Sequence, residues 1–133
     1  MKISLLCVLA LGLGLAAMPA LAHHSFAAEY DNKKPVDLTG TVTKVEWMNP
    51  HARFYLDVKD EKGTVTNWEF ELGSPNGLMR QGWTRNSMKI GDSVSVQGSK
   101  AKDGSKLANA RNVVLADGTQ VLGASSQDNQ ATK

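Results

Sequence analysis

The side chains best suited to chemistry are three histidines, which occupy only two places in the sequence. His23 and His24 are adjacent, and His51 follows Asn49-Pro50. A free terminal amine and the Nδ1 atom of the same histidine can chelate one metal ion, and a second imidazole can supply a third nitrogen. Nearly planar, nitrogen-only ligation favours Cu(II), which also heads the affinity order of the divalent first-row metals. The sequence therefore predicts a histidine-brace-like copper site, with His23 and His51 as ligands and His24 as an accessory or competing ligand.

The start of the sequence indicates how His23 would acquire a free amine. Lys2 precedes an uncharged run over residues 3–17, and Ala20-Leu21-Ala22 supplies the small residues that a signal peptidase recognises. The run is shorter than the about 20 residues of a bilayer span, so a cleaved secretory signal is favoured over a membrane anchor. Cleavage two residues earlier would put His23 in third place, which also chelates Cu(II). We expect a periplasmic or secreted protein without stable membrane insertion of the mature chain.

The histidines also fit a protein without metal chemistry. An adjacent pair at a mature amino terminus can be a solvated stub, and a histidine after Asn-Pro can simply cap a strand. Met48 could add a soft ligand for Cu(I), although a packed methionine is the simpler interpretation. The alternative function is a metal-free module that binds a glycan, a small molecule or another exported protein on the face that carries Tyr55.

Other kinds of chemistry find little support. Cys7 lies in the expected signal, so the mature chain has no disulfide and no thiol nucleophile. Neither a Gly-x-Ser-x-Gly turn nor a glycine-rich phosphate loop occurs. Glu69 and Glu71 share one strand face, which a solvated surface explains better than a glycosidase pair. Loss of Lys2 from 15 basic residues leaves 14 against 13 acidic ones, too even a balance to indicate nucleic acid binding. We expect a binding protein rather than an enzyme, with no catalytic residues.

The elements that must position these residues are short strands of alternating apolar and polar side chains. The strands are expected over residues 38–47, 52–59 and 65–72, from Gly91 onward, and over 108–115, with a brief extension at 119–122. A shift of parity between Val42 and Val45 indicates a β-bulge. Ser74 can cap a helix with Pro75 in its first turn, and Gly82 can end it, so one short helix is expected.

Three strands, a short helix and two strands form the element order of the OB-fold, an all-β, five-stranded, partly open barrel. A small β-sandwich is the alternative. The expected domain plan has a signal at 1–22, an N-terminal arm at 23–36 and the barrel at 37–122. Residues 123–133 lack a large apolar side chain, so we expect a disordered tail.

Four motifs, taken together, carry a resemblance to a known family. They are His23-His24-Ser25-Phe26, the Asn49-Pro50-His51 turn, Leu78 through Gly82-Trp83, and Gly91-Asp92 through Gly98. In these motifs the chain resembles a family of small exported bacterial proteins that is known chiefly as a domain of unknown function. The resemblance spans nearly the whole mature chain and implies an exported OB-like domain. It implies no activity, so the copper prediction depends on the histidines alone.

Overall fold

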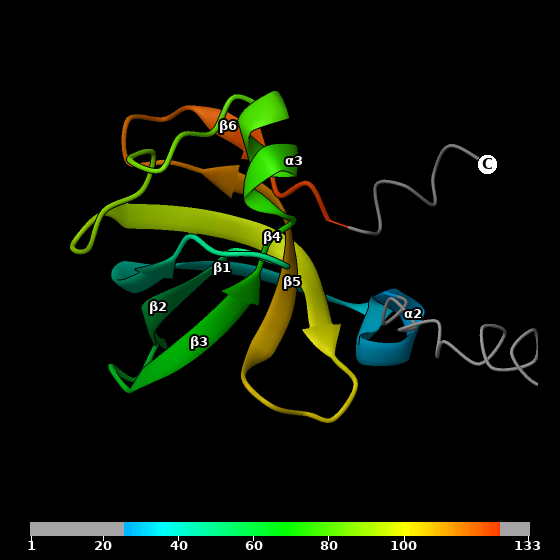
Figure 1. The fold of residues 1–133 in the computed structure, drawn as a ribbon. Helices are drawn as coiled ribbons and strands as arrows, with labels where there is room; N and C mark the ends of the chain where they lie inside the picture. The colour runs from blue at the N-terminus through cyan, green and yellow to red at the C-terminus, as the bar shows by residue number, and fades with distance from the viewer. Residues whose placement is uncertain (1–25, 126–133) are drawn as a thin grey trace, which may run out of the picture.

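The alternating segments form strands that close into a barrel in the computed structural model, which describes residues 26–125 (Figure 1). The elements are α2 (Phe26–Glu29), β1 (Tyr30–Glu46), β2 (Arg53–Lys59), β3 (Val65–Glu71), α3 (Pro75–Arg80), β4 (Ser93–Ala101), β5 (Leu107–Val114) and β6 (Gln120–Leu122). No helix within this part of the chain is long and apolar enough to cross a membrane.

The strand order confirms the predicted OB-fold. The sheet runs β3-β2-β1-β4-β5-β6, and an additional parallel pairing of β3 with β5 closes it on itself. All the other neighbouring strands are antiparallel. The short helix α3 lies between β3 and β4 in the chain, as expected for this fold. Its N-cap is Ser74, whose Oγ accepts a hydrogen bond from the amide of Gly77 at 3.2 Å.

The long strand β1 serves both sides of the barrel. It pairs with β4 over residues 30–41 and with β2 over residues 41–46. The predicted bulge is present as a register shift between Val42 and Lys44. At the changeover a Cβ on Gly40 would lie 2.5 Å from the carbonyl oxygen of Asp57, so only glycine permits this close crossing.

The structure corrects the prediction of an N-terminal arm at residues 23–36. Residues 30–36 belong to β1, and residues 26–29 form the helix α2, so the barrel begins earlier than residue 37. In the sequence, Pro35 indicates against a strand at this position because proline cannot donate a hydrogen bond to a strand ladder. The structure accommodates Pro35 at a second register shift, between Asp31 and Pro35.

The apolar face of each strand fills the barrel. Phe54 of β2 and Phe70 of β3 are fully buried, and their rings stack with centroids 5.0 Å apart. Trp68, Val94 and Val96 are also buried, as the alternation predicts. A smaller cluster of Phe26, Tyr30, Ala101 and Leu107 fixes α2 against the end of β4, where α2 lies in Figure 1.

The start of the expected disordered tail is also corrected. Gly123 accepts a backbone hydrogen bond from Gly73 at 2.7 Å and donates one to Arg111 at 2.6 Å. Ser125 is 2% exposed. These hydrogen bonds and this burial make residues 123–125 part of the folded domain. Residues 126–133, the expected signal at 1–22, His23 and His24 lie outside the described residues.

Candidate functional site

His51 stands in the loop that joins β1 to β2. Glu46 and Arg53 are the last paired residues on either side, and the Asn49–Pro50 bond in this loop is cis. The His51 side chain is 44% exposed, and its Nδ1 lies 3.0 Å from Oε1 of Glu71. A neutral imidazole that donates through Nδ1 keeps the Nε2 lone pair available. His51 is therefore oriented by a carboxylate and retains a nitrogen that can bind a metal.

Glu71 is the residue that sequence reasoning misjudged. It was expected on a solvated strand face, yet it is 6% exposed. Its second oxygen accepts a hydrogen bond from Arg53 at 3.4 Å, and Arg53 also forms an ion pair with Glu69. Parity treats Glu69 and Glu71 alike, and both residues pair with β5 in the closed barrel. Glu71 differs because His51 and Tyr30, from distant parts of the chain, lie beside its carboxylate.

Tyr30 brings the beginning of the barrel to the same carboxylate. Its side chain is buried, and its hydroxyl lies near Glu71 without a hydrogen-bond partner among the described residues. Burial raises the pKa of Tyr30 far above its ordinary value, and the negative charge of Glu71 adds to this rise. Phe26 stacks on Tyr30 with ring centroids 5.5 Å apart. Tyr30 at the start of β1 and His51 beyond its end thus meet at Glu71, because β1 curves around the barrel.

The predicted metal ligands are only partly placed. His51 is described, whereas His23 and His24 lie outside the described residues. Within residues 26–125 no group of three or more histidine, cysteine, aspartate or glutamate side chains could hold a metal ion. Met48, expected to be packed, is 54% exposed because the loop turns it away from the core.

The face around Tyr55 is already occupied by its own side chains. Lys44 Nζ lies 5.0 Å from the centroid of the Tyr55 ring, and the Tyr55 hydroxyl donates to Glu46 at 3.3 Å. Lys44 and Glu46 also form an ion pair. The ring is therefore half covered, which disfavours the stacking of a sugar on it.

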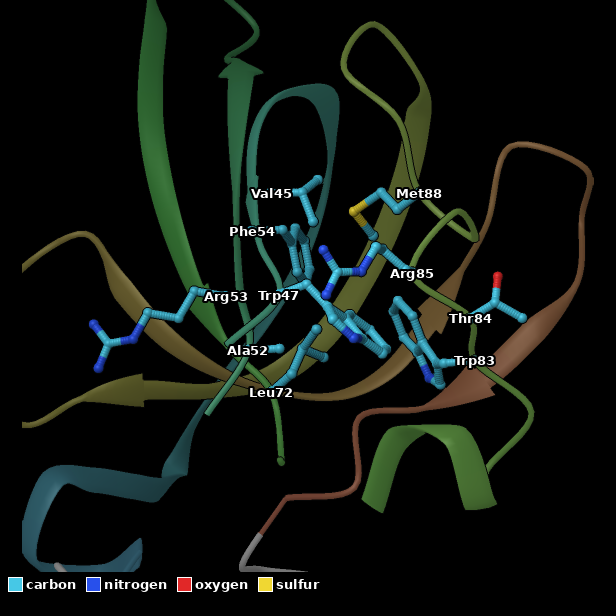
Figure 2. A pocket seen from close by; sticks show the side chains of 10 residues that line it. All are labelled: Val45, Trp47, Ala52, Arg53, Phe54, Leu72, Trp83, Thr84, Arg85 and Met88. Carbon is cyan, nitrogen blue, oxygen red and sulfur yellow. The ribbon is translucent and has the colours of Figure 1, made fainter. Parts of the chain in front are cut away.

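A small apolar hollow adjoins the His51 loop (Figure 2). It encloses about 240 Å³, including open solvent, and is lined by Val45, Trp47, Ala52, Arg53, Phe54, Leu72, Trp83, Thr84, Arg85 and Met88. Arg53 extends away from the hollow and pairs with Glu69 and Glu71, whereas Arg85 points toward it (Figure 2). The indole nitrogen of Trp83 donates to the carbonyl of Leu122 at 2.8 Å, so Trp83 is held as part of the barrel end. Only about 10 Å³ of this space admits the centre of a water-sized molecule, so the hollow holds about one water and is far smaller than a ligand pocket of roughly 300 Å³.

Comparison with known proteins gives a family and two distant structural likenesses. The model of DUF6152, a family of unknown function, matches residues 12–110. The fold is similar to the mitochondrial single-stranded DNA binding protein Rim1 of S. cerevisiae, with 8% identity, 62% of this chain and 92% of that chain covered, and a TM-score of 0.48.

The second structure is the N-terminal domain of PriB from Thermoanaerobacter tencongensis, with 18% identity, 63% and 97% coverage, and a TM-score of 0.46. No curated protein matches the sequence.

Proposed function

The chain belongs to DUF6152, a family of unknown function, and we propose that it is an exported, non-catalytic copper-binding protein. Cleavage of the signal exposes His23 as the first residue. Its amine and Nδ1 chelate Cu(II), His51 supplies the third nitrogen, and His24 is an accessory or competing ligand. The protein then handles copper in the periplasm or outside the cell.

One observation carries this proposal: the carboxylate of Glu71 is shared by His51 and by the beginning of the described chain. His51 Nδ1 lies 3.0 Å from Glu71, and Tyr30 is buried beside the same carboxylate. A histidine that binds a metal commonly donates its other ring N–H to a carboxylate, which fixes the ring and raises its basicity. The 3.0 Å contact between His51 Nδ1 and Glu71 fits this arrangement, and Nε2 is left for the metal.

The length of chain between the anchored residues and the expected amine supports the same conclusion. Phe26 is 4% exposed and stacks on Tyr30. His23 precedes Phe26 by three residues, which span at most about 11 Å. If the barrel anchored Phe26 far from His51, His23 and His51 could not bind the same metal ion. The contacts from Phe26 through Tyr30 and Glu71 to His51 favour a site that His23 and His51 share.

The test is copper binding by the mature protein. The protein is purified after export, its N-terminal mass is measured, and Cu(II) is titrated while the electron paramagnetic resonance spectrum is recorded. We expect a start at His23, one tightly bound ion and a nitrogen-rich signal. His51→Ala should lose one nitrogen from this signal. A matched variant with one glycine inserted before His23 keeps all three histidines and displaces the amine.

The two variants separate a built site from incidental binding. Loss of affinity in both supports the three-nitrogen site. Weak binding that neither variant changes would make the histidine pair a solvated stub and would overturn the proposal.

A further inference from the structure

The loop between β1 and β2 exposes a methionine next to His51. Met48 is 54% exposed. A single exposed apolar side chain is ordinary on a protein surface, so exposure alone indicates nothing. Its position relative to the candidate metal ligand is what distinguishes Met48 from the other exposed apolar side chains.

The two ends of this loop are anchored in the barrel, and its tip is exposed. Trp47 packs against the core at the first end. At the second end Ala52 is 1% exposed, donates to the carbonyl of Gly73 at 3.0 Å and accepts from the amide of Leu72 at 2.9 Å. The exposed residues between these anchors are 48–51. The loop therefore presents its four tip residues from a fixed base.

Met48 and His51 occupy equivalent places on the two arms of that tip. Glu46 pairs with Arg53, so Met48 and His51 each stand two residues inside the last paired position. They flank Asn49-Pro50, where the chain bends. Three residues separate their Cα atoms by at most about 11 Å when extended, and by less across a bend.

The chemistry of this pair differs from that of the nitrogen-only site. A thioether is a soft, uncharged donor that selects Cu(I), while imidazole accepts both oxidation states of copper. His51 Nδ1 is already directed at Glu71, so Nε2 is the donor that it can share with Met48.

We infer that Met48 is a soft-metal ligand that acts with His51, so that the site takes Cu(I) as well as Cu(II). This inference deepens the proposed copper function and names the second oxidation state of the cargo. The nitrogen ligands hold Cu(II), and the Met48–His51 pair holds Cu(I) on the same loop.

The test compares Ag(I), a redox-inert soft ion that stands in for Cu(I), with Cu(II) on the mature protein. Met48→Leu conserves volume at an exposed position, so the fold is retained. Loss of an outer-shell partner typically lowers metal affinity by about tenfold or more. Met48 would be a direct ligand, so its removal should lower the Ag(I) affinity by at least about tenfold. Cu(II) affinity should stay within about twofold. Met79→Leu, on α3 and 53% exposed, is the matched control and should change neither.

A direct readout accompanies the affinities. In the wild-type protein, Ag(I) should shift the methyl resonance of Met48 and leave that of Met79 unchanged. If Met48→Leu binds Ag(I) as the wild type does, this inference fails even where Cu(II) binding holds. If wild-type Cu(II) binding is weak while Ag(I) binding depends on Met48, the three-nitrogen proposal fails and the soft-metal pair stands.

Discussion

Replacement of Glu71 by glutamine tests the contact on which the proposed site depends. The substitution keeps the shape of the side chain and removes its charge. Glu71 is 8% exposed at its side chain, and it holds His51 at 3.0 Å and Arg53 at 3.4 Å. Both contacts are assisted by the charge of the carboxylate, and an amide retains only one accepting oxygen.

The expected loss of stability follows from these two contacts. A hydrogen bond to a charged group contributes about 1.5–3 kcal/mol. The partners are 44% and 40% exposed, so solvent weakens both contacts. We expect a total of about 2 kcal/mol, which corresponds to a fall in Tm of roughly 10 °C for a domain of this size. Glu69→Gln is the matched control: Glu69 is 27% exposed and pairs with Arg53 alone, so its loss should cost less than about 1 kcal/mol.

Two assays separate the structural effect from the functional one. Thermal and urea unfolding of the metal-free protein should rank Glu71→Gln well below Glu69→Gln. Cu(II) affinity of the folded mature protein should then fall by about 10–100-fold in Glu71→Gln, because an outer-shell carboxylate has been lost. Equal stability of the two variants would refute the described network. A Glu71→Gln variant that is less stable yet binds Cu(II) normally would refute the role of Glu71 in the site.

The other two predictions concern the beginning of the described chain. Tyr30→Phe should leave stability near neutral pH unchanged or slightly higher, because the removed hydroxyl is buried without a hydrogen bond. Because the pKa of Tyr30 is raised in the folded state, its contribution to the free energy of unfolding is fully present below pH 10 and falls by about 1.4 kcal/mol per pH unit above pH 10. Urea unfolding from pH 8 to 11.5 should show a smaller loss of stability with pH in the variant than in the wild type. An identical pH dependence would contradict this prediction. Phe26→Ala should lower the free energy of unfolding by about 3 kcal/mol, the lower end for a buried phenylalanine. Its Cu(II) spectrum should resemble that of His51→Ala, and circular dichroism should confirm that the barrel is folded during this measurement. A spectrum unchanged from wild type would show that α2 does not position the amine.

Local sequence signals were sufficient to predict most of the strands of the barrel. The inward side chains of β2, of β3 up to Phe70 and of the first half of β4 alternate, and alternation is set by strand geometry alone. The cap at Ser74 and the bulge after Val42 are also local, since each depends on residues close in the chain. Pro35 and the small residues at 123–125 carry misleading local signals, and their places in the fold depend on strands elsewhere in the chain.

By itself the sequence determined the element order, the inward faces of the strands and the choice of histidines as the candidate chemistry. Tertiary structure alone decided that Glu71 is buried, that Tyr30 shares its surroundings and that His51 Nδ1 lies 3.0 Å from its carboxylate. The physical reason is barrel closure. A strand pattern states which face a side chain takes, but the parallel pairing of β3 with β5 and the curvature of β1 determine which distant residues meet on that face.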